Sequence, residues 1–403
     1  MLAKTPPMGW NSWNTFGSKI SDQTIREIAD AFDALGLKKS GYEYLVIDDC
    51  WSEHERDPET RRIVPHHEKF PNGMKAVADY VHSKGLKFGM YSCAGLRTCG
   101  NYPGSFDHEF LDARTFAEWG VDFLKYDYCF LPATANGPLM YRRMGHALRA
   151  SGREILFSAC EWGCNDPWSW IRSAGAHMYR STGDINDSFE SFRDIAVSQI
   201  NFGPGFDWSQ PSDKLLKVIR AAGGGSSNAP GCFNDIDMLT VGMFGKGNVG
   251  SKGCDKTDYK TQFALWCFLG APLMLGADLR NFLKPDFKDM LDLVTNEGLI
   301  KIDQDEECRP AFRATEQPWG KDRIVLGRLL SGGDIAIGFF NLSEDDAQMY
   351  LYFETLGIPD AAGLNLRMRN VITGEDFGEK REFIDIKVPK HDCVVFRCTP
   401  AWR

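Results

Sequence analysis

The sequence lacks long apolar runs and any block of like charge. Of its 403 residues, 43% are hydrophobic, but no apolar stretch approaches the roughly 18 to 20 residues that span a bilayer. A protein anchored by membrane-spanning helices is therefore excluded. The formal charge is −9 with acidic and basic residues interspersed, which argues against nucleic acid or an anionic membrane as a partner. We expect a neutral or modestly polar ligand.

Motifs for metals, phosphates and dinucleotides are also missing. The 12 cysteines are spread singly, without a Cys-x-x-Cys pair, and there is no His-Glu-x-x-His, so we expect mostly buried thiols and no metal. The glycine run 223–225 lacks Gly-x-Gly-x-x-Gly spacing and a following Lys-Ser/Thr. It is therefore interpreted as a flexible loop without a phosphate cradle, and we expect no cofactor.

No secretory leader precedes the first predicted strand. Residues 1–4 pass directly into Thr5-Pro6-Pro7 without an apolar h-region. The expectation is a cytoplasmic chain. The alternative is a secreted or periplasmic protein whose signal peptide is absent from this sequence.

Aromatic residues are plentiful and many lie beside polar ones. They make up 12% of the chain, including 11 Trp, often next to Gly, Asp or Asn. Sugar rings stack their C–H faces on Trp while their hydroxyls bind carboxylates, so this composition suits a carbohydrate ligand.

Strand-forming and helix-forming segments alternate along the first 300 residues. Eight apolar runs predict strands, at 7–14, 44–49, 86–91, 121–127, 155–160, 176–180, 232–237 and 272–275. Residues with helical periodicity separate them, at about 22–35, 73–84, 106–119, 139–149, 189–200 and 259–268, with a short helix opened by Pro167. This alternation predicts a (β/α)8 TIM barrel over residues 1–308. The rival open doubly wound sheet would need the glycine fingerprint that is missing.

The pattern changes after about residue 310. Short alternating or β-branched runs, broken by turn residues, occur at 323–329, 335–342, 349–353, 364–369, 382–388 and 393–398. No helical period intervenes. Residues 309–403 are therefore predicted to form a C-terminal antiparallel β-sandwich.

Carboxylates follow several of the predicted barrel strands. They are Asp48, Asp49, Asp127, Glu161 and Asp184. Because the carboxyl ends of barrel strands meet at one face, these groups should converge, with Lys125 and Arg180 as the evident counter-ions. A polyhydroxylated ligand would satisfy them. A hard cation is the alternative, but nothing suggests a phosphate substrate for it to serve.

Two of these carboxylates suit the pair of groups that a glycosidase needs. Asp127 is the better nucleophile, because Lys125 lies two positions back on the same strand face and favours the charged form. Asp184 follows Gly183, in a loop that water and a leaving group can approach, and is the better acid/base.

Six segments carry a resemblance to a known family. They are 7–13 (Pro-Met-Gly-Trp-Asn-Ser-Trp), 48–51 (Asp-Asp-Cys-Trp), 125–129 (Lys-Tyr-Asp-Tyr-Cys), 160–162 (Cys-Glu-Trp), 180–185 (Arg-Ser-Thr-Gly-Asp-Ile) and 234–238 (Asn-Asp-Ile-Asp-Met). Together, in this order, they resemble glycoside hydrolase family 27, the α-galactosidases and α-N-acetylgalactosaminidases. The resemblance covers the whole barrel, whereas the C-terminal part agrees in architecture only.

The resemblance implies a retaining double displacement on a small or oligomeric substrate with a terminal α-galactose. Asp127 matches the family's nucleophile and Asp184 its acid/base. The residues implied to contact the sugar are Trp13, Asp48, Asp49, Tyr91, Lys125, Cys129 and Arg180. Trp13 is implied to stack on the ring, and Asp48 and Asp49 to bind the axial and primary hydroxyls. Tyr91 is implied to form a subsite wall, and Lys125 and Arg180 to hold hydroxyls. Glu161 with Trp162 resembles the loop that crowds the 2-position in galactosidases, which favours galactose over N-acetylgalactosamine.

Some positions depart from the family's pattern. Cys99 and Cys129 match a family disulfide, but Cys50 and Cys160 lack their customary partners, because Ser18 and Ala176 stand there. A reduced cytoplasmic relative with Cys99 and Cys129 as thiols therefore stays open. Three alternatives to an α-galactosidase also stay open: a β-L-arabinopyranosidase, an α-N-acetylgalactosaminidase and an inactive galactose-binding protein. The sequence does not decide aglycone preference or whether the chain forms a homo-oligomer.

Overall fold

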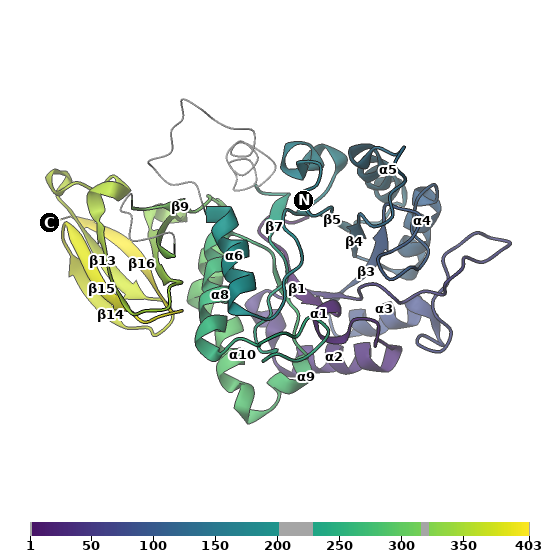
Figure 1. The fold of residues 1–403 in the computed structure, drawn as a ribbon, viewed down its shortest axis with the longest axis horizontal. Coiled ribbons are helices and arrows are strands. Elements are labelled where there is room, and N and C mark those ends of the chain that lie inside the picture. Colours follow the sequence, from purple (N-terminus) through teal and green to yellow (C-terminus); the bar gives the residue numbers. More distant parts are fainter. Residues whose placement is uncertain (1, 201–228, 316–321, 403) are drawn as a thin grey trace.

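The computed structural model describes residues 2–200, 229–315 and 322–402. Eight parallel strands form one sheet with the order β7-β6-β5-β4-β3-β2-β1-β8 (Figure 1). Their bounds are β1 Met8–Asn11, β2 Tyr44–Val46, β3 Lys87–Cys93, β4 Phe123–Asp127, β5 Leu156–Cys160, β6 Met178–Arg180, β7 Phe233–Asp235 and β8 Leu273–Leu275. Every predicted strand is present. The predicted loop at 223–225 lies outside the described residues.

The two ends of this sheet meet and close it into a barrel. Just after β7, Leu239 forms a parallel bridge with Leu275 at the end of β8. The Leu239 amide donates to the Met274 carbonyl at 2.8 Å, and the Gly276 amide donates to the Leu239 carbonyl at 3.0 Å. The predicted (β/α)8 architecture is therefore confirmed.

Helices surround the barrel strands. The α-helices are α1 Trp13–Phe16, α2 Asp22–Ala34, α3 Gly73–Ser83, α4 Glu109–Trp119, α5 Gly137–Ala150, α6 Phe189–Ile200, α8 Lys256–Leu269, α9 Leu279–Phe282, α10 Lys288–Val294 and α11 Glu297–Asp303. The 3-10 helices of this region are η1 Leu37–Ser40, η2 Pro167–Ser169, η3 Ile171–Ala174 and η4 Pro285–Phe287. The short helix predicted at Pro167 is thus η2.

Local sequence explains where these helices begin. Ser21 caps α2 by accepting a hydrogen bond from the Thr24 amide, and the helix buries Ile25, Ile28 and Phe32 against the barrel. Helix α4 begins at Glu109, three residues later than predicted. Asp107 has φ +61°, which is a left-handed backbone conformation. Such a residue cannot be part of a right-handed α-helix, so α4 cannot extend past it toward the N-terminus.

An antiparallel sandwich follows the barrel, at one side of it in Figure 1. A six-stranded sheet, β14-β13-β16-β11-β10-β9, faces the two-stranded sheet β12-β15. The strands are β9 Phe312–Arg313, β10 Arg323–Leu329, β11 Ile335–Asn341, β12 Ala347–Tyr352, β13 Leu364–Asn370, β14 Asp376–Lys380, β15 Phe383–Val388 and β16 Cys393–Trp402; the 3-10 helices are η5 Ser331–Gly333, η6 Phe353–Leu356 and η7 Asp360–Ala362. The sequence patterns missed β9 and β14. The boundary at residue 308 stays a prediction.

The sandwich has its own apolar core. Alternate side chains of the two sheets, among them Ile337, Phe339, Met349 and Ile384, are buried together. This alternation is what two packed sheets require.

Strand β4 shows how the barrel aims its polar side chains. Phe123 joins the small apolar cluster formed with residues of other barrel strands, while Leu124 and Tyr126 belong to the large core beneath the helices. Because side chains alternate along a strand, Lys125 and Asp127 share the inner face with Phe123. The strand therefore delivers both charged groups to the barrel mouth.

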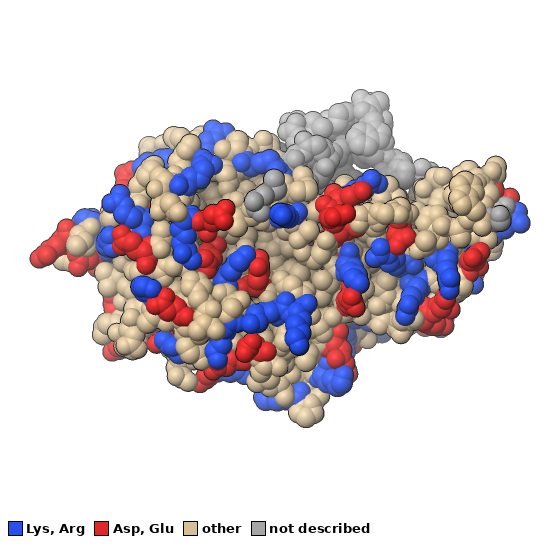
Figure 2. Space-filling view, turned by 180° about the vertical axis from the view of Figure 1, so that it is seen from behind, with Lys and Arg blue, Asp and Glu red and all other residues tan. Residues whose placement is uncertain are grey.

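The surface shows mixed charge. Acidic and basic side chains are interspersed over the face seen in Figure 2. Among the described residues, no helix combines the length and apolar character needed to span a bilayer.

Candidate active site

A pocket opens where the barrel strands end. It is lined by most of the site residues predicted from the sequence: Trp13, Asp48, Asp49, Tyr91, Lys125, Asp127, Arg180 and Asp184. Cys99, Asp237 and Met238 also line it. Residues from strands far apart in the sequence are thus brought to one cavity at the carboxyl end of the barrel.

Asp127 lies deep in this pocket. It is 6% exposed. The Tyr91 hydroxyl donates to its Oδ2 at 2.9 Å, and the Tyr128 amide donates to its Oδ1 at 2.8 Å. Burial raises the pKa of Asp127 to about 6, although Lys125 and these two donors act in the opposite direction. The carboxylate is therefore ionised in neutral solution and held in a fixed orientation.

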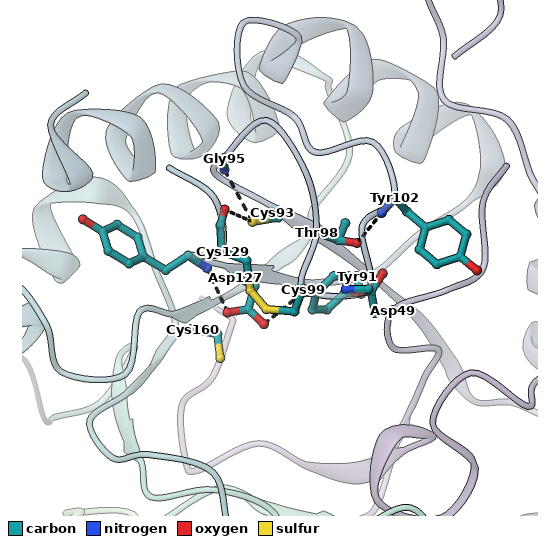
Figure 3. The surroundings of a disulfide bond; sticks show 12 residues. Asp49, Tyr91, Cys93, Gly95, Thr98, Cys99, Tyr102, Asp127, Cys129 and Cys160 are labelled. Atoms are coloured by element: carbon teal, nitrogen blue, oxygen red, sulfur yellow. Dashed lines mark hydrogen bonds between the residues drawn. A yellow bond between two sulfur atoms is a disulfide. The ribbon is translucent and has the colours of Figure 1, made fainter. Parts of the chain in front are cut away.

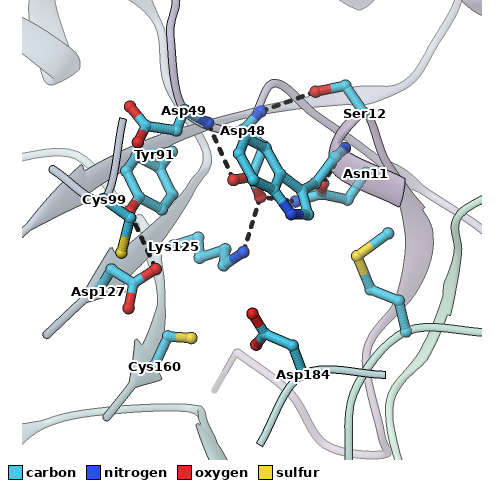
Figure 4. A network of polar contacts seen from close by, with 12 residues as sticks. Asn11, Ser12, Asp48, Asp49, Tyr91, Cys99, Lys125, Asp127, Cys160 and Asp184 are labelled. Atoms are coloured by element: carbon cyan, nitrogen blue, oxygen red, sulfur yellow. Dashed lines mark hydrogen bonds and ion pairs between the residues drawn. The ribbon is translucent and has the colours of Figure 1, made fainter. Parts of the chain in front are cut away.

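Lys125 contacts a different carboxylate from the one predicted. The sequence suggested Asp127 as its charge partner, but the ammonium forms its ion pair with Asp48 Oδ2, at 2.8 Å (Figure 4). Burial lowers the pKa of Lys125. Neighbouring groups, chiefly Asp48, raise this pKa by more, so the ammonium stays charged. Lys125 still favours the ionised form of Asp127 through the field of its charge.

The Asp48–Asp49 pair is buried and supported by neighbouring backbone. Asn11 donates to Asp48 Oδ2 at 2.7 Å, and the Asp48 amide donates to the Ser12 hydroxyl at 2.9 Å. The Gly100 amide donates to Asp49 Oδ2 at 2.7 Å. Burial raises the pKa of Asp49. Both carboxylates are therefore preorganised acceptors for groups such as sugar hydroxyls.

Asp184 occupies the opposite, open side of the pocket. Its side chain is 75% exposed, and Arg180 Nη2 lies 2.9 Å from its Oδ1. Burial by itself raises the pKa of Asp184, but Arg180 and Lys125 together lower it by more. Figure 4 shows that Asp127, Asp184 and the Lys125 ammonium are directed at the same space.

Asp237 is a functional neighbour to which the sequence reasoning assigned no role. Its Oδ2 lies 2.7 Å from Arg180 Nη2 and accepts from the Ile185 amide at 2.7 Å. Asp237 therefore fixes both Arg180 and the loop that carries Asp184. It has φ +91°, and backbone strain of this kind gathers at functional sites. The only sequence signal was the motif at 234–238.

A disulfide joins Cys99 and Cys129 beside Asp127 (Figure 3). It links the loop after β3 to the end of β4. Two glycines permit the tight packing of this loop: a Cβ on Gly95 would lie 2.0 Å from the Cys129 carbonyl oxygen, and one on Gly104 would lie 2.0 Å from the Gly95 carbonyl oxygen. Cys99 lines the pocket, whereas Cys129, which was predicted to contact the sugar, is absent from its lining.

Glu161 and Trp162 follow β5 but are absent from the pocket lining. The Glu161 carboxylate is fully buried and accepts from the Asn165 side chain at 2.8 Å. Burial raises the pKa of Glu161 to about 7. The Trp162 ring packs edge-on against Tyr128 with ring centroids 6.0 Å apart. Their assignment to the 2-position of the sugar stays a prediction.

In the described part of the chain, two groups of side chains bring potential metal-ligand atoms close together. Cys99, Asp127 and Cys129 form one, but both sulfur atoms belong to the disulfide and cannot act as thiolates. Glu53, His66 and His67 form the other. The two imidazole rings there are stacked with centroids 5.4 Å apart, and His67 Nδ1 lies 2.6 Å from Glu53 Oε1.

A barrel with two carboxylates facing one polar pocket at its carboxyl end has the architecture of a glycoside hydrolase. Comparison with known proteins identifies the family. Residues 5–305 match the family model described as alpha galactosidase A, and residues 320–398 match the alpha galactosidase C-terminal β-sandwich domain. The chain belongs to this α-galactosidase family of glycoside hydrolases.

Individual relatives agree along the full length. The chain is 38% identical to alpha-galactosidase A of Cellvibrio japonicus, over 99% of this chain and 93% of that protein. The crystal structure of alpha-galactosidase I from Mortierella vinacea superposes with a TM-score of 0.82 at 29% identity, over 99% and 98% of the two chains. A β-L-arabinopyranosidase from Geobacillus stearothermophilus has a TM-score of 0.79 at 23% identity, over 99% and 97%, and shares the fold alone.

Proposed function

We propose that this enzyme releases terminal α-linked D-galactose with retention of configuration, using Asp127 as nucleophile and Asp184 as acid/base. One observation carries the assignment. Asp127 is fixed at the buried end of the pocket by two hydrogen bonds, whereas Asp184 lines the same pocket from its exposed side. The attacking group must be held rigidly beneath the sugar, and the proton donor must stand where the leaving group departs.

In the first step, an Asp127 carboxylate oxygen attacks the anomeric carbon. The bond from that carbon to the leaving oxygen breaks, and the electron pair stays on the oxygen, which takes the proton of Asp184. The products are a galactosyl ester of Asp127, the free alcohol and an ionised Asp184.

In the second step, Asp184 takes a proton from a water molecule. The water oxygen attacks the anomeric carbon, the ester bond breaks, and its electron pair returns to Asp127. Two inversions give net retention. Tyr91, which donates to Asp127, stabilises the carboxylate as leaving group in this step.

Protonation of the pair must change when substrate binds. In this structure the pKa of Asp127 is about 6 and that of Asp184 lies below its ordinary value. Asp127 is thus ready as nucleophile above pH 6. Asp184 gains its proton when the substrate covers its exposed carboxylate, because desolvation disfavours the charged form of a carboxyl group.

A mechanism-based covalent galactosyl label tests the nucleophile. After trapping, peptide mapping by mass spectrometry should locate the label on Asp127, and Asp127→Asn should remain unlabelled. Asp49→Asn serves as the matched control, since it removes a pocket carboxylate but leaves the nucleophile in place. A label on any other carboxylate would show that the assignment is wrong.

The identity of the sugar is proposed from the Asp48–Asp49 pair and from the loop after β5. Asp48 and Asp49 offer adjacent buried acceptors for the axial and primary hydroxyls of galactose. Glu161 with Trp162 is proposed to crowd the 2-position. Rates on p-nitrophenyl α-galactoside, β-L-arabinopyranoside and α-N-acetylgalactosaminide should favour the first substrate; a preference for either of the others would overturn the choice of sugar.

The compartment of the enzyme is linked to the disulfide. Disulfides persist in oxidising compartments and are rare in the cytosol, so the Cys99–Cys129 bond supports the secreted or periplasmic alternative over the cytoplasmic expectation. Alkylation of the protein after denaturation, without added reductant, should modify the 10 free cysteines. Modification of all 12 would support the reduced, cytoplasmic form. Sedimentation velocity would decide between a monomer and a homo-oligomer.

A further inference from the structure

The sandwich touches the barrel next to the segment that carries Asp184. The contact is made by His391, in the turn between β15 and β16. We propose that His391 is a positioning residue for Asp184: it fixes the start of α6 and, through it, the loop that presents the acid/base carboxylate. This role depends on the one proposed above for Asp184.

His391 stacks on the first residue of α6. Its imidazole lies parallel to the Phe189 ring, with centroids 3.5 Å apart and planes at 9°. Phe189 is 7% exposed, and Phe192 meets it edge-on at 5.1 Å. The Phe189 ring is therefore held from two sides, one of which belongs to the sandwich.

His391 is itself tightly held. Its backbone has φ +58°, a conformation that is strained for a non-glycine residue and persists only where the surroundings impose it. The Thr261 hydroxyl on α8 donates to its carbonyl at 2.8 Å. The imidazole Nδ1 lies 3.2 Å from Asp258 Oδ1, and Nε2 lies 3.3 Å from Glu344 Oε1.

The first turn of α8 extends this contact toward the active site. Asp258 closes the capping box of α8 with Asp255. The next residue, Tyr259, donates its hydroxyl to the carboxylate of Asp187 at 3.0 Å. Asp187 is fully buried, also accepts from the Gly245 amide at 2.6 Å, and comes three residues after Asp184. The same helix end therefore supports both His391 and the acid/base loop.

Asp184 depends on this support as well as on Asp237, which accepts from the neighbouring Ile185 amide. The Asp184 side chain is 75% exposed, and its ion pair is with Arg180. The loop backbone then decides where the carboxylate lies. A misplacement of about 1 Å in a catalytic group can cost on the order of 100-fold in rate, so loosening Phe189 should reduce proton donation.

Leaving-group dependence separates this role from a merely structural one. Protonation by Asp184 matters for a poor leaving group such as methanol and hardly at all for 2,4-dinitrophenolate. His391→Ala should lower kcat/KM for methyl α-galactoside by about tenfold and for the dinitrophenyl galactoside by less than about twofold. Partial unfolding would lower both rates equally, so the ratio is independent of the folded fraction.

Two further variants complete the test. His391→Phe keeps a ring against Phe189 and should restore the ratio. Tyr352→Ala removes an exposed aromatic ring of the sandwich and should leave both rates unchanged. Equal losses on both substrates in His391→Ala, or no loss, would overturn the positioning role.

Asp184→Ala separates the two assignments. It should show the same leaving-group dependence more strongly. If it does so and His391→Ala does not, His391 has no positioning role while Asp184 keeps its own. If Asp184→Ala shows no such dependence, the acid/base assignment fails and the role of His391 falls with it.

Discussion

Removing the hydroxyl of Tyr91 should move the acidic limb of the pH–activity profile. Tyr91 donates a 2.9 Å hydrogen bond to Asp127 Oδ2, and both groups are buried. This bond favours the ionised form of Asp127, whose pKa burial raises to about 6. In Tyr91→Phe the carboxylate loses that donor, so its pKa should rise further.

The size of the shift follows from the strength of a hydrogen bond to a charged group. Such a bond is worth about 1.5–3 kcal/mol, and one pKa unit corresponds to about 1.4 kcal/mol. The full effect is therefore roughly one to two units. Because water can enter the pocket and replace part of the lost bond, we expect the lower end, about one unit.

The assay is kcat/KM for p-nitrophenyl α-galactoside as a function of pH, since this ratio reports groups of the free enzyme. As the proposed nucleophile, Asp127 must be ionised to attack, so activity should fall as pH drops through its pKa. The wild-type limb should lie near the Asp127 pKa of about 6, and that of Tyr91→Phe about one unit higher.

Tyr128→Phe is the matched control, because its hydroxyl contacts Asn165 instead of Asp127. An unchanged or lowered limb in Tyr91→Phe, or an equal shift in Tyr128→Phe, would refute the proposed link between Tyr91 and the Asp127 charge.

Three other expectations concern the same site. Asp127→Asn should abolish turnover yet raise the melting temperature at neutral pH. The pKa of Asp127 is about 6 in the folded protein against an ordinary 3.8. Ionisation of this carboxyl group therefore destabilises the folded protein by about 3 kcal/mol above pH 6, and this destabilisation is absent below pH 3.8. The measurement is differential scanning calorimetry, and a melting temperature of Asp127→Asn below that of wild type would contradict this destabilising effect. Asp184→Ala with azide should regain activity on an activated galactoside and yield the α-galactosyl azide by NMR, because azide attacks the β-galactosyl ester of Asp127 with a second inversion; a β-azide would contradict the double displacement. Cys99→Ser with Cys129→Ser opens a 30-residue loop and should cost about 3–4 kcal/mol in denaturant unfolding, whereas a midpoint equal to that of wild type would show that the bond is absent in the native protein.

Much of the fold could be predicted because its signals are local. The run of apolar residues before Asp127 and the periodicity of α2 each depend on neighbours within a few positions, and both elements are present. The missed elements had weak local signals. Strand β14 is exposed or half-buried throughout and carries polar residues and a glycine, so neither alternation nor apolar content distinguishes it from a turn.

A barrel rule combined with recognisable motifs explains why most of the predicted site residues could be placed at one pocket. Parallel strands end at one face, so Asp48, Asp127 and Asp184 could be placed in one pocket before any contact was known. Glu161 satisfies the strand-end rule but is turned to Asn165 and lies outside the pocket lining. The rule fixes where a side chain begins and leaves its direction undecided.

The sequence by itself determined the barrel, the sandwich and the family, and it singled out the carboxylates proposed as the catalytic pair, because strand periodicity and short motifs are properties of adjacent residues. Only the tertiary structure decided which charges meet. Lys125 pairs with Asp48, 77 positions away, instead of Asp127, and Asp237 reaches Arg180 across the end of β7. His391 reaches Phe189 from another domain. Such contacts depend on side-chain direction and on the packing of distant segments, and no local pattern encodes either.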